Sequence, residues 1–383
     1  MKPVTIVGGG LAGLAAANAL ADSGAKITLI ERAQTPGGRA RTSHEHGYAI
    51  NFGPHALYKG GVTNRMLAEW GMKIQATAPA PGPLACFVKN NERLPFVRDI
   101  DNILTNAADV RSADSVETWL ARQTTSEDTR ASLRTVFRVS NYADDLTKLN
   151  ARAGLEQITM SRDHGVLYVD GGWQSIVEGL AARARDKGVE IRCGEPMTDL
   201  TALGGSKIIL AVPPFEVERL TGNKFEGLVP VKMSALTLGL RRLPEGSALF
   251  ALGVDRPLYL SVHSSWARVA PEGAALVHLG TYGGGPREEL EQFADLLLPN
   301  WRGEAEVVQF LPTMMVMYGM PTPAGRPEVN ALGEDILIAG DWVGPTGLLG
   351  DAATASGLRA ASFLAESVAI VLSPQASQYG QSQ

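Results

Sequence analysis

Three glycines near the start of the chain, Gly8, Gly10 and Gly13, have the G-x-G-x-x-G spacing of a turn that binds a dinucleotide. The first glycine permits a tight turn, the second lets the backbone approach a pyrophosphate, and the third lets a helix pack closely on a strand. An acid, Glu31, follows at roughly the 20-residue distance at which a carboxylate meets a ribose. This spacing predicts chemistry that depends on a bound dinucleotide.

The segments around these residues are those that a βαβ unit needs. Residues 4–7 are apolar and β-branched like a buried strand, and residues 14–23 are rich in Ala and Leu with no Pro or Gly. Gly24 stands where a helix would stop, and residues 26–30 predict a second strand that leads to Glu31. The phosphates are expected at the N-terminus of the helix, where free N–H groups and the helix dipole favour an anion.

Two further motifs follow within the first 55 residues. Residues 37–42 read Gly-Gly-Arg-Ala-Arg-Thr, and residues 47–55 read Gly-Tyr-Ala-Ile-Asn-Phe-Gly-Pro-His. With the glycine triplet and the acid, this order resembles the FAD-binding start of the flavin amine oxidase and phytoene (carotenoid) desaturase superfamily, nearer to its phytoene dehydrogenase-like branch. Asn51 stands where many members have Asp. The resemblance covers nearly the whole chain and is most specific at residues 4–55 and 336–361.

The C-terminal part of the chain carries the resemblance as well. Residues 335–341 predict a strand that ends in Gly-Asp, a Gly-rich loop runs to Asp351, and residues 352–371 predict a helix containing Ser-Gly-Leu-Arg-Ala-Ala. Because the superfamily ends in the same way, the resemblance implies that Asp341 lies by the ribityl chain or pyrophosphate of FAD. The cofactor-binding residues that the motif and the resemblance imply are Gly8, Gly10, Leu11, Ala12, Gly13, Glu31, Arg32, Gly38, Arg39, Gly53, Pro54, His55, Met197, Asp341, Leu348 and Leu349.

The predicted fold class is α/β, with a Rossmann-type (glutathione-reductase-like) FAD-binding domain into which an α+β substrate domain is inserted. The expected ranges are 1–75, 166–214 and 326–372 for the FAD-binding domain, 76–165 and 215–325 for the substrate domain, and 373–383 for a polar tail that we expect to be disordered.

Composition excludes several classes of function. The 383 residues are enough for a large core and two joined domains, and 45% hydrophobic with 20% charged residues is ordinary for a soluble globular protein. A net charge of −5 provides no basic field to attract nucleic acid. No run reaches the ~18 apolar residues of a membrane span. Cys86 and Cys193 have no metal-ligand spacing, so we expect no metal site and a cytoplasmic location.

The expected partner is a small, lipophilic substrate, bound by a monomer or homodimer without nucleic acid and without a transmembrane span; transient contact with a membrane stays open. Arg130, Arg134 and Arg138 recur every four residues. They form either a solvated basic face or a site for an anion such as a phospholipid headgroup.

The resemblance implies transfer of a hydride from a substrate carbon to flavin N5, while side chains orient the substrate and exclude water. Two reactions fit: desaturation, dehydrogenation or isomerisation of an apolar, isoprenoid-like substrate, and oxidation of an amine by O2. We favour the first because residues 234–240 lack the Lys that many amine oxidases carry there. The loop of residues 347–350 also lacks the aromatic residue of an amine cage.

Two histidines are candidates for acid/base catalysis, His55 in the Gly-Pro-His turn and His263 on a predicted strand of the substrate pocket. The alternative at each is structural: a hydrogen bond within a turn for His55, and packing for His263. A hypothesis of another class is a non-catalytic FAD-binding partner protein. A dehydrogenase that uses only a nicotinamide would leave the Gly-Gly-Arg and Gly-Asp segments without a role.

Overall fold

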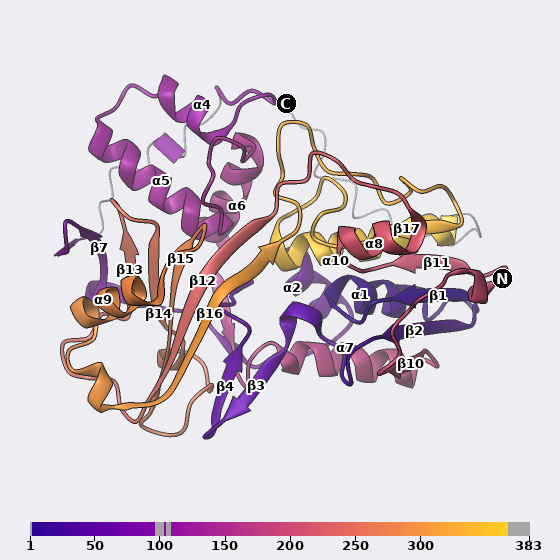
Figure 1. Cartoon of the computed structure of the whole chain (residues 1–383), viewed down its shortest axis with the longest axis horizontal. Coiled ribbons are helices and arrows are strands. Elements are labelled where there is room, and N and C mark those ends of the chain that lie inside the picture. The colour runs from indigo at the N-terminus through magenta and orange to yellow at the C-terminus, as the bar shows by residue number, and fades with distance from the viewer. Residues whose placement is uncertain (1, 96–102, 105–108, 367–383) are drawn as a thin grey trace.

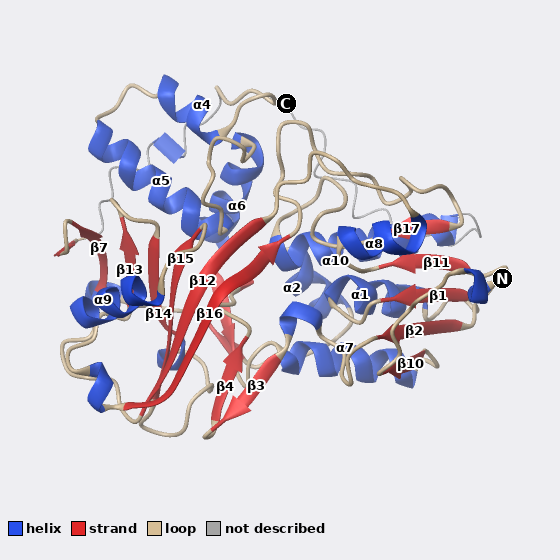
Figure 2. Ribbon diagram, in the orientation of Figure 1, coloured by secondary structure: helices blue, strands red, loops and turns tan. Residues whose placement is uncertain are grey.

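The computed structural model of the chain describes residues 2–95, 103–104 and 109–366. Figures 1 and 2 show two halves side by side, one built on a parallel sheet with its helices and the other on a larger twisted sheet. The end of the predicted C-terminal helix, residues 367–371, and the predicted disordered tail, residues 373–383, lie outside the described residues.

The first half contains a parallel sheet of the Rossmann type (Figure 2). Each strand pairs in parallel with its neighbour, so the carboxyl ends of all strands face the same edge of the sheet. The loops that follow these strands therefore meet at one edge although they are far apart in the sequence. In sheet order the strands are β10 (Glu190–Cys193), β2 (Ile27–Glu31), β1 (Val4–Val7), β11 (Lys207–Leu210) and β17 (Ile336–Ile338).

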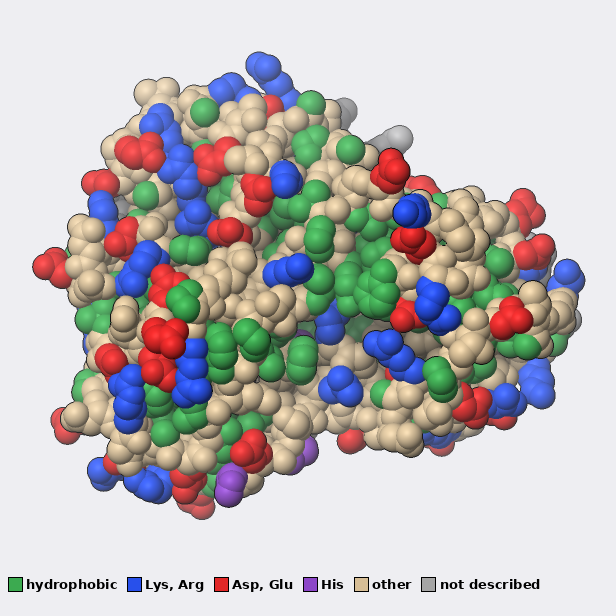
Figure 3. Space-filling model, in the orientation of Figure 1, with side chains coloured by type: hydrophobic (Ala, Val, Ile, Leu, Met, Phe, Trp, Pro, Cys, Tyr) green, Lys and Arg blue, Asp and Glu red, His purple; other side chains and the backbone are tan. Residues whose placement is uncertain are grey.

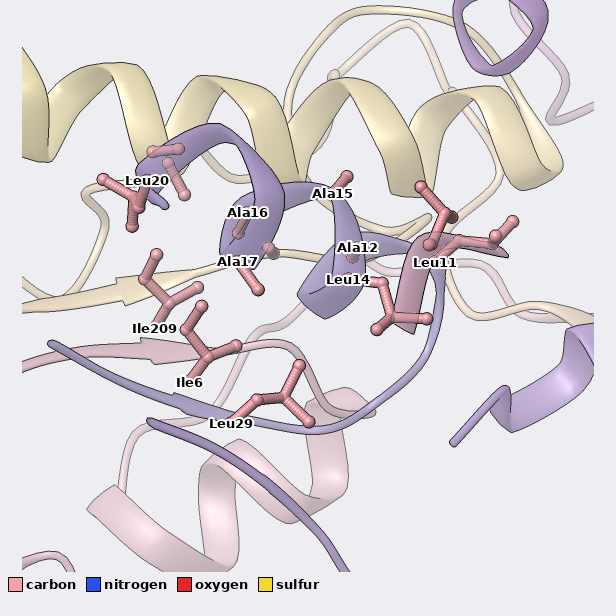
Figure 4. Packing of buried hydrophobic residues seen from close by; sticks show 14 of the residues in the cluster. Ile6, Leu11, Ala12, Leu14, Ala15, Ala16, Ala17, Leu20, Leu29 and Ile209 are labelled. Atoms are coloured by element: carbon pink, nitrogen blue, oxygen red, sulfur yellow. The ribbon is translucent and has the colours of Figure 1, made fainter. Parts of the chain in front are cut away.

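Helix α1 (Leu11–Leu20) is the centre of this half. Figure 4 shows it between the strands that carry Ile6, Leu29 and Ile209 on one side and α10 (Leu349–Glu366) on the other. The backbones of the two helices are in close contact at Gly357 of α10. A Cβ added to this glycine would lie only 2.2 Å from the carbonyl oxygen of Ala12, so the contact leaves no room for a side chain. The other helices of this half are α2 (Val62–Glu69), α7 (Gln174–Asp186) and α8 (Pro214–Thr221).

The second half contains a mixed sheet in which only the β13–β7 pairing is parallel. Its longest strand, β16, forms one edge and was not predicted from the sequence. In sheet order the strands are β16 (Ala305–Met317), β12 (Val231–Leu240), β15 (Ala275–Tyr282), β14 (Leu258–Val262), β13 (Phe250–Gly253), β7 (Ala85–Lys89) and β8 (Glu92–Leu94).

Four helices accompany this sheet. Helix α9 (Arg287–Leu297) buries Leu290 and Phe293 against strands β12, β14 and β15. Helices α4 (Val116–Arg122), α5 (Glu127–Asn141) and α6 (Ala151–His164) form a separate cluster whose core includes Trp119 and Phe137. Among the described residues, no helix combines the length and the apolar character that crossing a membrane requires.

Short strands lie between the halves. They are the hairpin of β3 (Thr42–Glu45) and β4 (Tyr48–Asn51), and a small sheet of β5 (Leu57–Tyr58), β9 (Val166–Val169) and β6 (Ala76–Thr77). The predicted α/β class with a Rossmann-type domain is confirmed. The division into two domains stays a prediction, and near its boundary at residue 214 helix α8 packs Val217 into the core of the parallel sheet.

Candidate functional site

A cavity of about 690 Å³ runs along the carboxyl edge of the parallel sheet and continues between the two halves. Its lining comes from the loops after β1, β2, β11 and β17, from the Gly-Gly-Arg turn and from β16. Figure 3 shows hydrophobic side chains gathered at the junction of the two halves, with Lys and Arg side chains beside them. This is the position at which open α/β sheets bind their ligands.

The first turn of α1 leaves room for an anion. Gly10 is the N-cap residue, no side chain caps the helix, and a Cβ added to Gly10 would meet no atom within 4 Å. By contrast, a Cβ on Gly13 would lie 1.9 Å from the carbonyl oxygen of Gly8, and one on Gly8 would lie 2.3 Å from that of Ala211. Packing therefore requires glycine at Gly8 and Gly13, whereas Gly10 is open to a ligand.

The carboxylate of Glu31 is held by two backbone donors. The N–H of Gly9 donates to Oε2 at 2.6 Å, and that of Ala33 donates to Oε1 at 2.8 Å. Glu31 lines the cavity, and each carboxylate oxygen keeps a lone pair that could accept a hydroxyl of a ribose. Its neighbour Arg32 also lines the cavity and lies 3.5 Å from the carboxylate of Glu216.

Arg39 and Asp341 form a second polar group along the cavity. Arg39 Nη1 donates to Asp341 Oδ2 at 2.7 Å and to the carbonyl of Val316 at 2.7 Å, and its guanidinium lies 4.9 Å from the ring centroid of Tyr318. Asp341 is 2% exposed, and its Oδ1 has no hydrogen-bond partner among the described residues. A buried carboxylate oxygen without a donor costs free energy, which a ligand hydroxyl would offset.

His55 lies where the cavity meets Trp173. The two rings are in edge contact with centroids 5.0 Å apart, and His55 Nδ1 lies 3.0 Å from the carbonyl oxygen of Gly53, which requires a proton on Nδ1. Burial lowers the pKa of His55, although the hydrogen bond to Gly53 opposes this effect. The ring is therefore neutral at neutral pH. The turn depends on Gly53, whose φ is 88°.

The predicted residues are placed as follows. Gly8, Gly10, Leu11, Ala12, Glu31, Arg32, Gly38, Arg39, Pro54, His55, Met197, Asp341 and Leu349 line the cavity, whereas Gly13, Gly53 and Leu348 do not. Gly13 and Gly53 act through backbone packing instead, and Leu348 is buried in the core of α4, α5 and α6. The carbonyl of Met197 accepts a hydrogen bond from Arg219 at 2.6 Å.

The structure places His263 outside the site, contrary to its predicted place in the substrate pocket. The residue is 3% exposed and does not line the cavity. Its ring stacks on Tyr168 with centroids 4.1 Å apart and contacts His278 at 4.5 Å. Burial lowers the pKa of His263 well below its ordinary value, so the ring stays neutral. His263 therefore fits the packing role that the sequence suggested as the alternative to catalysis.

Several cavity residues were missed from the sequence. Tyr58, Tyr142, Trp173, Met314 and Asp351 line the part of the cavity next to α5, β16 and α10, which we call the inner compartment. Tyr142 has a left-handed backbone with a φ of 52°, a conformation that non-glycine residues adopt rarely and often at functional sites. Of these five residues, Trp173 is the one that the local sequence could have indicated, because a large aromatic residue directly follows the flexible pair Gly171-Gly172.

Asp351 is a buried carboxylate in the first turn of α10. The N–H of Thr63, in the first turn of α2, donates to Asp351 Oδ1 at 2.8 Å, and Oδ2 has no partner among the described residues. Burial raises the pKa of Asp351. No ion pair of the described residues includes Asp351, so it is an uncompensated carboxylate on the cavity wall.

The basic residues of α5 are neutralised locally. Arg130 pairs with Glu127 at 3.4 Å, Arg134 with Glu117 at 2.8 Å, and Arg138 lies 3.9 Å from Asp144. These pairs leave less free positive charge for an anion, but the three side chains are only 21–26% exposed, so the stripe is not a fully solvated face either. In the described part of the chain, no group of three or more His, Cys, Asp or Glu side chains could hold a metal ion.

Sequence comparison identifies relatives of the N-terminal segment. Residues 6–70 match a family model described as an NAD(P)-binding Rossmann-like domain. L-amino-acid oxidase from Daboia russelii is 34% identical over 92 residues, which are 23% of this chain and 18% of that protein. Carotenoid 3,4-desaturase from Haloarcula japonica is 41% identical over 70 residues, which are 18% of this chain and 14% of that protein. The chain thus spans less than a fifth of the length of these curated relatives.

Structural neighbours extend over the whole fold. An oxidoreductase from Methanosarcina mazei has a TM-score of 0.75 over 93% of this chain and 99% of its own, at 15% identity. Cyclohexylamine oxidase from Brevibacterium oxydans has a TM-score of 0.68 over 96% of this chain and 99% of its own, at 17% identity. At these identities the likeness shows the fold. The comparisons confirm the resemblance to the flavin amine oxidase and carotenoid desaturase superfamily, and both branches occur among the relatives.

Proposed function

We propose that this chain is an FAD-dependent oxidoreductase. The observation that carries the proposal is a single cavity that contains the open N-terminus of α1, the oriented carboxylate of Glu31 and the buried carboxylate of Asp341. A helix N-terminus suits a pyrophosphate, the remaining lone pairs of the Glu31 carboxylate suit the hydroxyls of a ribose, and Asp341 Oδ1, which has no donor among the described residues, suits a hydroxyl of a ribityl chain. These residues fit FAD.

Each part of the site has a distinct task in this proposal. The backbone N–H groups at Leu11 and Ala12 hold phosphate, Glu31 holds the ribose, and Arg39 orients the carboxylate of Asp341. When bound, FAD supplies the acceptor for a hydride from the substrate. The inner compartment then orients the substrate and excludes water, because Tyr142, Met314 and Leu349 belong to one apolar cluster that borders it.

Desaturation of an apolar, isoprenoid-like substrate is the reaction that we place first. The wall formed by Met314 and Leu349 is apolar, and strand β12 contributes no residue to the cavity lining. Lys232, at the start of that strand, is exposed. The strand therefore brings no lysine to the cavity, as we expected from the absence of a lysine in residues 234–240.

Oxidation of an amine is the second candidate, and Asp351 favours it. A carboxylate without an ion-pair partner stands on the cavity wall near aromatic rings, and cations bind well to such surroundings. Residues 347–350 include no aromatic residue, but Tyr58, Tyr142 and Trp173 bring aromatic rings to the cavity from other segments.

The test is an absorbance spectrum of the purified protein, followed by anaerobic reduction with candidate substrates and readmission of air. Bands near roughly 375 and 450 nm would establish bound flavin. Reduction by an apolar polyene precursor with slow reoxidation supports desaturation, and reduction by amines with rapid reoxidation supports the second candidate. Bound flavin that no substrate reduces would favour a non-catalytic FAD-binding partner. A colourless protein that takes up no added FAD would overturn the proposal.

A suitable control for these measurements is Gly10→Val. Its Cβ would meet no protein atom within 4 Å, so the side chain would enter the space in front of the first turn of α1. The variant should fold and remain colourless, whereas a yellow Gly10→Val protein would show that flavin binds elsewhere.

A further inference from the structure

The guanidinium of Arg326 is bound to one loop of the cavity by four hydrogen bonds. Nε donates to the carbonyl of Gly344 at 2.8 Å, and Nη1 donates to that of Asp341 at 3.0 Å. Nη2 donates to the carbonyls of Thr346 at 3.4 Å and Gly347 at 2.8 Å. Among the described residues no carboxylate forms an ion pair with Arg326, so its bonds go to the loop backbone.

This loop, residues 341–347, joins strand β17 to helix α10 and has little regular structure of its own. Gly344 and Gly347 have φ values of 75° and 69°, and the residue after next, Leu349, has a φ of 53°. The N–H of Gly344 donates to the carbonyl of Pro327, next to Arg326 in the sequence, at 2.8 Å. The path of the loop is thus set from outside, by the segment that carries Arg326.

The two ends of the loop are both on the cavity. Asp341 begins it, with its side chain paired to Arg39, and Leu349 follows it on the wall of the inner compartment. Arg326 itself does not line the cavity. Any effect of Arg326 on a ligand must therefore pass through the loop.

We propose that Arg326 is a positioning residue for the cofactor: by holding four carbonyls of residues 341–347, it fixes the carboxylate of Asp341 and the start of α10 against the bound FAD. This inference rests on the proposed function. The guanidinium presents five N–H donors in a rigid planar fork, whereas a lysine ammonium has three donors on one nitrogen atom and cannot reach four carbonyls that lie this far apart along the loop. Burial lowers the pKa of Arg326 to about 10, so the group is a cation throughout the neutral range.

The test compares Arg326→Lys with Arg122→Lys. Arg122 also makes four hydrogen bonds, to Asp114 and to the carbonyls of Thr118 and Asp109, but it lies at α4, away from the cavity. Apoprotein of each variant is titrated with FAD, and the visible spectrum of the bound flavin and the thermal midpoint without FAD are recorded. Arg326→Gln, which keeps donors without the charge, replaces the lysine variant if that protein does not fold.

Arg326→Lys should raise the Kd for FAD about tenfold or more and alter the flavin spectrum, whereas Arg122→Lys should leave both within about twofold. A merely structural role would lower the thermal midpoint of both variants and leave FAD affinity unchanged, and that result would overturn the assignment. Wild-type protein that binds no FAD would overturn the proposed function as well, so the two failures are distinguishable.

Discussion

Arg39 Nη1 lies 2.7 Å from Asp341 Oδ2 and joins residues 302 positions apart in the sequence, from the Gly-Gly-Arg turn to the loop after β17. Asp341 is almost fully buried, whereas the side chain of Arg39 is 34% exposed. The pair therefore holds two walls of the cavity together.

Arg39→Met should destabilise the protein by about 2 kcal/mol, because it leaves the carboxylate of Asp341 buried without a cation; the exposure of Arg39 reduces the cost below that of a fully buried pair. Urea unfolding without added FAD measures the change. The double variant Arg39→Met/Asp341→Asn should lose less than the sum of the two single variants, and strict additivity would contradict the coupling.

Gly10→Ala and Gly13→Ala form a matched pair of substitutions in α1. The Cβ at residue 13 would collide with the Gly8 carbonyl at 1.9 Å, so Gly13→Ala should lower the free energy of unfolding by about 2 kcal/mol or more. Gly10→Ala should leave the apoprotein as stable as the wild type and weaken FAD binding, because its methyl group stands where a phosphate would approach. Thermal unfolding and FAD titration of both variants check this, and equal stability of the two apoproteins would count against the packing role of Gly13.

Asn51, which departs from the Asp of many superfamily members, binds the backbone of the residue that precedes helix α7. Its Oδ1 accepts hydrogen bonds from the N–H of Trp173 at 2.9 Å and from the hydroxyl of Thr42 at 2.8 Å. Asn51→Asp keeps this acceptor at a helix N-terminus and should change the free energy of unfolding by less than about 0.5 kcal/mol. Asn51→Leu should cost about 1–3 kcal/mol. Urea unfolding of both variants distinguishes them, and equal losses would show that these hydrogen bonds of Asn51 do not contribute to stability.

Two buried histidines, His263 and His278, together with the partly exposed His55 make stability depend on pH. Burial lowers the pKa of His55 and of His263, and lowers that of His278 to about 3, from an ordinary value of 6.5. Below pH 6.5 the unfolded chain therefore binds protons that the native protein does not. The stability that is present above pH 6.5 should be lost progressively as the pH falls toward 3.

The variant His278→Gln tests this, because glutamine can keep the hydrogen bond to Thr237. Its free energy of unfolding should fall less steeply below pH 6.5 than that of the wild type, by up to about 1.4 kcal/mol per pH unit. Urea unfolding from pH 7.5 to pH 5 gives the slopes. Parallel slopes would show that His278 takes up its proton in the native state too.

The sequence reveals the parts of the site in which the backbone has a positive φ angle or makes a contact too close for a side chain. Gly8, Gly13 and Gly53 stand where a side chain would collide or where φ is positive, so glycine spacing reports them directly. Tyr58 and Tyr142 reach the same cavity through pairing with β9 and through the end of α5. Such placements arise from contacts far apart in the sequence, which local periodicity does not report.

The edge strand β16 was missed for a related reason. Its buried and exposed side chains do not alternate regularly, its pairing with β12 contains register shifts, and Pro312 lies within it. Conversely, His263 was predicted on a strand that faces the substrate pocket, but it follows the end of β14 at Val262, begins a short 3-10 helix and lies in the core. A strand pattern does not say which side chains face a cavity and which face the core.

The packing of α10 on α1 constrains when a ligand can be taken up during synthesis. The glycine turn of residues 8–13 leads into α1, whereas Asp341, Leu349 and the helix that covers Ala12 come from the other end of the described chain. A nascent chain on the ribosome therefore has a dinucleotide turn without the opposite wall, and it exposes the apolar side of α1 until α10 emerges. If FAD binds as proposed, the site can enclose it only after α10 has packed on α1, with residues from both ends of the described chain around the cofactor.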